Sequence, residues 1–296
     1  MNNICCIIVT YNIGNELSKC FYSILNQVDK VIIVDNGSDL ETVKYINHLK
    51  KEHSNKVEYL LNQNNMGIAF ALNRGIELAL KENFEWILTL DNDSIATEGM
   101  VDVMLKTYSK LSKNEQKDVV SLFPTHLEIN FKNFKNEKSE FNKLNYNYIE
   151  TDITSGNILN KKLFYSVGFF NESLFIDYVD FEYCLRLSEY GYKQIKVHDA
   201  KLIHHLGNSK QIKIFNKRID YTNHSALRRY YITRNRFFIW NKFKKHKAFI
   251  TFDKSAFIKE TIKIILFENN KYQKIKMTLK GFKDYKNKKF GKLKEI

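Results

Sequence analysis

Hydrophobic positions in the first 120 residues follow two alternating periods. Short apolar runs suited to buried strands occupy Cys5–Thr10, Val31–Val34, Val57–Leu61, Trp86–Leu90 and Val119–Phe123. Between some of these runs, over residues 15–28 and 67–81, apolar residues recur every three or four positions, as on one face of a helix. This alternation of strand and helix predicts an α/β fold with a doubly wound, mostly parallel sheet.

The pattern weakens after residue 123. Residues 124–150 are polar with little periodicity, and we interpret them as a loosely structured insertion. The pattern returns over 152–160 and 174–193, where we predict a helix from Asp180 onward, and helices dominate from about residue 222. The chain is therefore expected to hold an α/β body followed by a helical C-terminal region.

Charge separates the same two parts. Residues 1–200 carry a net charge of −6, whereas residues 201–296 carry +20. A basic region on a mildly acidic body indicates a polyanionic partner, and both nucleic acid and an anionic membrane leaflet fit. No nucleic-acid recognition fold is evident in the sequence, so we expect no nucleic acid as a partner.

Four cysteines show neither metal-site nor disulfide spacing, which favours reduced, buried thiols in a cytosolic protein. The longest apolar runs are shorter than 18 residues, so no transmembrane helix is expected. The N-terminal apolar run lacks the basic flank and cleavage site of a signal peptide. We therefore expect a cytoplasmic protein that is able to associate peripherally with the inner face of the cell membrane.

Polar clusters follow three of the predicted strands. Thr10-Tyr11, Asp35-Asn36 and Asp91-Asn92-Asp93 each stand where a strand ends. In doubly wound sheets, ligands bind beyond the carboxyl ends of the strands, so these clusters are expected to meet on one rim. Asp91 and Asp93 suit either a divalent cation or a capped turn.

Two further segments have alternatives of the same kind. Asp35 suits either an acceptor for an N–H of a bound base or a turn between strand and helix. Gly67 opens a predicted helix, whose N-terminus can face an anion. Neither P-loop spacing nor a G-x-G-x-x-G turn is present there, which excludes those two classes of nucleotide site.

Acidic and histidine residues cluster again downstream. The segment "FIDYVDFEYCLRL" contains Asp177, Asp180 and Glu182, and Asp180 stands at the start of the predicted helix, where a carboxylate is favoured. The segment "LIHHLG" offers His204 and His205 as metal ligands if the fold brings them to the two aspartates.

Taken together, these motifs resemble glycosyltransferase family 2, which has the GT-A fold, over about residues 4–207. The resemblance rests on "IIVTYN", "VIIVDNGSD", the N-x-G-x-x-x-A-x-N-x-G pattern at 65–75, "LDNDS", "TSGNILN", "VDFEYCLR" and "HHLG". Their order is most similar to bacterial rhamnosyltransferases of cell-surface polysaccharide assembly. The segment "RRYYITRNR" at 228–236 resembles the region that follows the transferase core in that subgroup.

The resemblance implies a role for each matching residue. Thr10, Tyr11, Asp35 and Gly67 would bind the nucleotide, with Asp91 near the ribose. Asp93 and His204 would ligate Mg²⁺ or Mn²⁺, Asp180 would be the general base, and Ser155, Gly156 and Asp177 would shape the donor–acceptor cleft. The catalytic GT-A domain would span 1–220, with a nucleotide-sugar half of about 1–123 and an acceptor half of about 150–220, before a basic helical region at 221–296.

The implied activity is metal-dependent, inverting transfer of a sugar, which we expect to be L-rhamnose from dTDP-L-rhamnose, to a glycan or lipid-linked glycan. Alternatives are another UDP- or dTDP-hexose donor, or a non-catalytic basic scaffold or nucleic-acid-binding protein. The basic C-terminal helices would either pack on the body as a hairpin or bind an anionic membrane surface. Homo-oligomer formation is left open.

Overall fold

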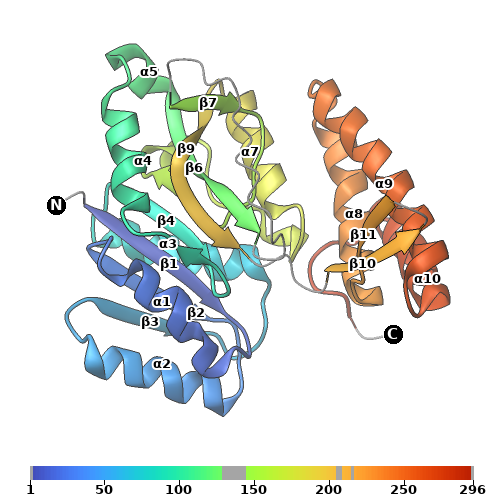
Figure 1. The fold of residues 1–296 in the computed structure, drawn as a ribbon, viewed down its shortest axis with the longest axis horizontal. Helices are drawn as coiled ribbons and strands as arrows, with labels where there is room; N and C mark the ends of the chain where they lie inside the picture. The colour runs from blue at the N-terminus through green and yellow to red at the C-terminus, as the bar shows by residue number, and fades with distance from the viewer. Residues whose placement is uncertain (1–2, 129–144, 205–208, 215–216, 295–296) are drawn as a thin grey trace. The chain divides into compact units, whose positions relative to one another are not determined.

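The computed structural model describes residues 3–128, 145–204, 209–214 and 217–294. Its residues form two compact units (Figure 1). The N-terminal unit comprises Met1–Asn171 with Tyr183–His205, and the C-terminal unit comprises Glu172–Glu182 with Leu206–Ile296. We call residues 172–182 the strap. Each unit is described by itself.

The N-terminal unit is built on a nine-stranded sheet in the order β3-β2-β1-β4-β8-β6-β9-β5, with β7 paired to β9 (Figure 1). Its strands are β1 (Ile4–Thr10), β2 (Lys30–Asp35), β3 (Val57–Leu61), β4 (Trp86–Asp91), β5 (Ile95–Ala96), β6 (Val119–Glu128), β7 (Tyr146–Ile149), β8 (Asn157–Asn160) and β9 (Lys193–His204). Its helices are η1 (Gly14–Glu16), α1 (Leu17–Leu25), α2 (Leu40–Glu52), α3 (Ile68–Lys81), α4 (Met100–Ser109), α5 (Lys113–Asp118), α6 (Lys162–Ser166) and most of α7 (Val179–Glu189).

The first four strands of this sheet are parallel and confirm the α/β prediction. Every residue of β1 is buried, which explains why its sequence is a continuous apolar run rather than an alternating one. The register places Thr10 of β1 opposite Asp35 of β2, and Val9 opposite Asp91 of β4. The polar residues at these strand ends therefore share one rim of the sheet, as the sequence predicted.

The other half of the sheet is mixed, and it corrects the interpretation of residues 124–150 as an insertion. Strand β6 continues to Glu128, where Thr125 to Glu128 pair with Lys201 to His204 of β9. Strand β7 pairs antiparallel with β9. Backbone pairing needs no apolar side chains, so a polar sequence concealed these strands. Residues 129–144 lie outside the described part of the chain.

The C-terminal unit contains the hairpin β10 (Ser209–Ile214) and β11 (Lys217–Thr222) and the helices α8 (Ala226–Lys242), α9 (Lys247–Phe267) and α10 (Lys271–Lys286). The strap contributes η2 (Glu172–Leu174) and the first residues of α7. Helices α8 and α10 approach closely, since a Cβ on Gly281 would lie 2.4 Å from the carbonyl oxygen of Tyr230. The predicted helical C-terminal region is thus confirmed.

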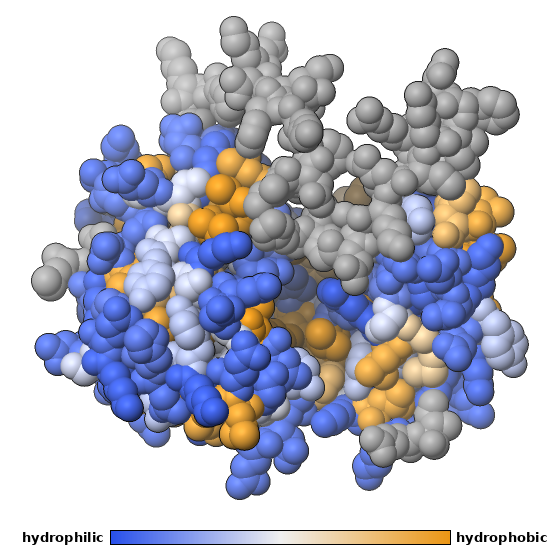
Figure 2. Space-filling model, turned by 60° about the horizontal axis from the view of Figure 1, so that its bottom comes forward, coloured by the Kyte–Doolittle hydropathy of each residue, from blue (hydrophilic) through white to orange (hydrophobic). Residues whose placement is uncertain are grey.

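Hydrophobic side chains remain at the surface of this unit (Figure 2). On α9, Ile258, Ile262, Ile265 and Leu266 are each at least half exposed. Their spacing of i, i+4, i+7 and i+8 places them on one face of the helix. Among the described residues, no helix is long and apolar enough to cross a membrane.

Candidate active site

Three potential metal ligands converge at the end of β4. One ligand atom each of Asp91, Asp93 and His204 lies within 4.8 Å of the others, and we call this cluster the metal corner. Asp93 and His204 approach to 3.9 Å between Oδ1 and Nδ1. Carboxylates suit Mg²⁺ or Mn²⁺, and the imidazole favours the transition metal of the two. The donor set therefore fits a divalent cation. The other candidate histidine, His205, lies outside the described residues.

Two buried hydroxyl groups, of Ser94 and Ser155, form hydrogen bonds to residues of the metal corner. Ser94 Oγ lies 2.9 Å from His204 Nδ1 and 2.8 Å from Ser155 Oγ, and either atom of each pair can donate. Ser155 Oγ also accepts a hydrogen bond from the backbone N–H of Asp91 at 3.1 Å. This chain of contacts fixes the imidazole and the turn relative to each other, as outer partners of metal ligands do.

His126 extends this network, although sequence reasoning missed it. Its Nε2 donates to the carbonyl oxygen of Ser155 at 3.0 Å, and its ring lies edge-on to that of His204, with centroids 6.2 Å apart. Burial lowers the pKa of His126, and the nearby carboxylate of Asp152 partly offsets this effect. The segment around His126 has no motif, and only the strand pairing of β6 with β9 brings it here.

Ser155 and Gly156, predicted to shape a cleft, stand beside the metal corner at the start of β8. Gly156 has φ +81°, and a Cβ there would lie 2.7 Å from Pro124 Cγ. Its N–H donates to the carbonyl oxygen of Thr89 at 2.7 Å. Only glycine fits this close approach, which holds Ser155 under Asp91.

Thr10 and Asp35 meet as the register requires, and Asp35 is 1% exposed. The Asp35 carboxylate accepts from Thr10 Oγ1 at 2.9 Å, from Ser38 Oγ at 2.5 Å, and from the backbone N–H groups of Gly37 and Ser38 at 3.1 and 2.9 Å. These contacts form the turn that the sequence offered as one alternative. A base N–H would share an oxygen already in use, and the base contact stays a prediction.

The other predicted nucleotide residues border the same rim. Tyr11 is 48% exposed directly after β1. Gly67 precedes α3 with φ +92°, and its N–H donates to Asn65 Oδ1 at 3.0 Å. Asn36 Oδ1 accepts from the N–H of Met66 at 3.0 Å, so the loop before α3 is tied to the end of β2.

The strap, in the C-terminal unit, carries Asp177 and Asp180. Three of its residues adopt left-handed backbone conformations that bulky side chains rarely take: Phe175 (φ +67°), Asp177 (φ +62°) and Tyr178 (φ +65°). Such strain persists only where surrounding contacts enforce it, and it clusters at functional sites. Asp180 follows in the first turn of α7.

Residues of α8 supply the enforcing contacts, and sequence reasoning missed their role. Asn235 is fully buried, and its Nδ2 donates to the carbonyl oxygens of Leu174, Ile176 and Asp177 at 2.9, 2.8 and 2.9 Å. Arg234 Nη2 donates to the carbonyl oxygen of Leu174 at 2.9 Å. The only sequence signal was the segment "RRYYITRNR", whose arginine and asparagine side chains point to no partner by themselves.

Charged contacts complete the hold on the strap. Arg228 pairs with Asp177 Oδ1 at 3.0 Å, whereas Asp177 Oδ2 is buried and has no hydrogen-bond partner among the described residues. Burial raises the pKa of Asp177, and Arg228 partly offsets this effect. Lys242 Nζ donates to Glu182 Oε1 at 2.7 Å, and Glu182 is fully buried. Two members of the acidic cluster, Asp177 and Glu182, are therefore paired with bases of α8.

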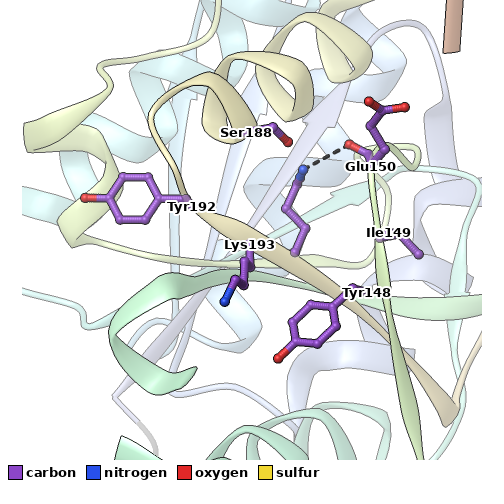
Figure 3. Close-up of a pocket in the computed structure, with 7 residues that line it drawn as sticks. Tyr148, Ile149, Glu150, Ser188, Tyr192 and Lys193 are labelled. Atoms are coloured by element: carbon purple, nitrogen blue, oxygen red, sulfur yellow. Dashed lines mark hydrogen bonds between the residues drawn. The ribbon is translucent and has the colours of Figure 1, made fainter. Parts of the chain in front are cut away.

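Two cavities of the N-terminal unit complete the description. One of about 80 Å³ lies beside Asp93 and is lined by Asn92, Lys19 and Cys20 among others. A larger one of about 380 Å³ lies between β7, β9 and the end of α7 (Figure 3). There, Gln194 Nε2 donates to the carbonyl oxygen of Glu150 at 3.0 Å, and the Lys193 ammonium stands 5.8 Å from the ring centroid of Tyr148. The lining of this larger cavity contains none of the residues that the sequence singled out.

Comparisons with known proteins fit this geometry. The family model "Glycosyl transferase family 2" matches residues 5–170. The chain is 31% identical over 256 residues to dTDP-rhamnosyl transferase RfbF of Shigella flexneri, which covers 81% of each chain. Among solved structures, GalNAc-T7 with UDP, GalNAc and Mn²⁺ superposes with a TM-score of 0.56 at 14% identity, over 72% of this chain and 44% of that one. At that identity the likeness shows the fold alone.

Proposed function

Because the chain belongs to glycosyltransferase family 2 and is an enzyme that transfers a sugar, we propose that it transfers L-rhamnose from dTDP-L-rhamnose to a glycan or lipid-linked glycan of a cell-surface polysaccharide. The donor assignment is supported by the relationship to a dTDP-rhamnosyl transferase over most of both chains. The metal corner supports the chemistry, because the carboxylates of Asp91 and Asp93, at a strand end inside the region that matches the family, converge with the imidazole of His204, which lies beyond that region.

In this proposal Asp93 and His204 hold Mg²⁺ or Mn²⁺, and Asp91 lies near the ribose or binds a metal-bound water. A divalent cation would neutralise charge on the departing diphosphate. Ser94 and Ser155 keep the imidazole and the Asp91 turn in place through their buried hydrogen bonds. Thr10, Tyr11, Asp35 and Gly67 border the nucleotide.

Asp180 is the proposed general base. It would accept the proton of the acceptor hydroxyl as the sugar C1–O bond to diphosphate breaks, and attack from the opposite face would invert the anomeric centre. Asp177, with one buried oxygen that lacks a partner among the described residues, would contact the acceptor. These roles come from the motif match, and the strained strap supports them as a functional segment.

A donor panel tests the proposal. Purified full-length protein is incubated with dTDP-L-rhamnose, UDP-galactose, UDP-glucose or GDP-mannose, and release of nucleoside diphosphate is measured with Mn²⁺, with Mg²⁺ and with chelator. We expect release from dTDP-L-rhamnose that requires a divalent cation. Faster release of nucleoside diphosphate from another sugar nucleotide would show that the donor is not dTDP-L-rhamnose. Undiminished release in chelator would contradict the proposed role of a divalent cation.

We also propose that the C-terminal unit binds an anionic membrane surface and so holds the enzyme peripherally at the cytoplasmic face. The sequence left open whether the apolar face of residues 257–266 packs inward, and the structure exposes Ile258, Ile262, Ile265 and Leu266. Lys254 and Lys259 are exposed on the same helix. An apolar stripe accompanied by lysines is typical of helices that lie in a membrane interface.

Vesicle co-sedimentation tests this surface. With vesicles that contain phosphatidylglycerol, Ile262→Asn/Leu266→Asn is expected to weaken binding at least about tenfold, since each removes a half-exposed apolar side chain from the interface. The matched control, Leu40→Asn/Tyr165→Asn, alters exposed apolar residues of the N-terminal unit. Equal binding by both double variants would count against the assignment.

A further inference from the structure

A basic cavity of the C-terminal unit has no role in the transfer chemistry described so far. It measures about 550 Å³, and its lining combines α8, α10 and the chain after α10. The lining residues are Tyr230, Lys280, Asp284, Lys288, Lys289, Phe290, Lys292, Leu293 and Lys294. A volume of this size is in the range of small-molecule binding pockets.

The charge of this lining is unbalanced. Asp284 is already engaged, since it accepts from Tyr230 Oη at 3.0 Å and pairs with Lys280 at 3.3 Å. The other four lysines of the lining are Lys288, Lys289, Lys292 and Lys294, and they form no ion pair with any residue that the structure describes. Ammonium groups gathered around one concavity repel one another unless an anion neutralises them.

The chain that carries these lysines is held in place. After α10, the N–H of Gly291 donates to the carbonyl oxygen of Ser173 in the strap at 2.7 Å, and the carbonyl oxygen of Gly291 accepts from Arg234 Nη1 at 2.7 Å. The N–H of Leu293 donates to Tyr231 Oη at 2.8 Å. A fixed backbone therefore keeps the lysines near one another, which distinguishes this lining from a frayed basic tail.

We propose that this cavity, which we call the lysine pocket, binds a phosphate or diphosphate group. Three features of the pocket support this ligand. Its ammonium groups are compact donors suited to phosphate oxygens, and Phe290 offers an apolar wall for a chain attached to the phosphate. The pocket is also joined to the strap by the hydrogen bond from Gly291 to Ser173. The group belongs to a lipid-linked acceptor or to a phospholipid headgroup. The acceptor assignment rests on the transferase function proposed above, whereas the anion site does not.

Calorimetric titration of the full-length protein with inorganic pyrophosphate in chelator tests the pocket, because chelator prevents binding through a metal at the metal corner. Lys289→Gln/Lys292→Gln/Lys294→Gln is expected to weaken pyrophosphate binding about tenfold or more. The matched control, Lys244→Gln/Lys245→Gln/Lys276→Gln, removes the same charge from exposed lysines of the same unit outside the pocket and is expected to change affinity less than about threefold.

Two outcomes would overturn the proposal: no pyrophosphate binding by the wild-type protein, or equal weakening in the pocket and control variants, which would show a diffuse charge effect. Competition identifies the natural source. Displacement of pyrophosphate by geranyl diphosphate supports a lipid-linked diphosphate, and displacement by phosphatidylglycerol vesicles alone supports a headgroup. Because no sugar donor is present, failure here leaves the transferase proposal untouched, and absence of sugar transfer leaves this binding result standing.

Discussion

The metal corner and the strap each present a pair of aspartates, but the fold holds the two pairs in different ways. Asp91 and Asp93 follow a buried strand, and the parallel register of β1, β2 and β4 determines where they lie. Asp177 and Asp180 stand on a segment with three left-handed residues, held by Asn235, Arg234 and Arg228 of α8.

The difference shows two ways to position a reactive group. A sheet edge places side chains through backbone pairing, which many sequences can satisfy. The strap depends on individual buried donors, because one side-chain amide, that of Asn235, donates to three of its carbonyl oxygens. Substitutions far from any substrate contact should therefore impair the strap more readily than the metal corner.

The largest expected effect tests the strap directly. Asp180→Asn removes the proposed base, and turnover is expected to fall about 10²- to 10⁴-fold. Binding of dTDP-L-rhamnose, measured by calorimetry with Mn²⁺, is expected to stay unchanged, because the donor is assigned to the N-terminal unit. Glu189→Gln, at the exposed end of α7, is the control. Wild-type turnover in Asp180→Asn would remove Asp180 from the chemistry.

The corresponding test of the metal corner is Asp93→Asn. Loss of one carboxylate from the cluster is expected to lower Mn²⁺ affinity, and turnover at limiting Mn²⁺, by about 100-fold. Metal affinity is measured by calorimetry without nucleotide. Asp102→Asn changes an exposed aspartate of α4 that pairs with Lys106 at 2.7 Å, and it should leave both quantities unchanged. Equal metal binding in both variants would argue that these aspartates serve the turn alone.

Asn235→Ala sharpens the comparison, since it acts on the strap without touching a proposed reactive group. Without its carboxamide the strap loses three hydrogen bonds, and kcat is expected to fall about 10- to 100-fold through misplacement of Asp180. The donor Kd is expected to stay constant, and the free energy of unfolding should fall by about 1–3 kcal/mol. Asn269→Ala, an exposed asparagine of the same unit, is the control. A parallel loss of donor binding would show general damage to the fold instead.

The smallest expected effect is that of Ser94→Ala. This substitution removes the hydroxyl between His204 and Ser155, and Mn²⁺ affinity is expected to fall about tenfold. The control is Ser109→Ala, whose hydroxyl is at the exposed end of α4. An unchanged Mn²⁺ affinity would mean that backbone pairing by itself orients the imidazole.

The sequence predicted the sheet edge well because its causes are local. Apolar runs marked β1 to β4 within one or two residues, and the rule that ligands bind at the ends of parallel strands brought Thr10, Asp35 and Asp91 together. His126 escaped notice since its strand is polar and its place depends on pairing with β9. Prediction from periodicity failed where hydrogen bonding, rather than burial, formed the strand.

The C-terminal helices show a second limit. Periodicity identified an apolar face on residues 257–266, but it could not tell which face is covered. In the structure α9 instead buries Ile250, Ile264 and the charged Asp253. The buried Asp253 carboxylate pairs with Arg236 at 3.2 Å and also accepts from Trp240 Nε1 and Tyr178 Oη at 2.8 and 2.7 Å. Polar partners on α8 and the strap therefore help to determine which face of α9 is buried. The sequence pattern of α9 by itself contains no information about these partners.

The hold of α8 on the strap also has a consequence for the time at which the protein matures. Asp177 leaves the ribosome 58 residues before Asn235, the residue that secures its backbone. At about 5–20 residues per second, the strap waits about 3–12 s for its partner during synthesis. Through that interval the left-handed residues lack the donors that enforce them, so the segment that bears Asp180 takes its shape only after α8 has been made.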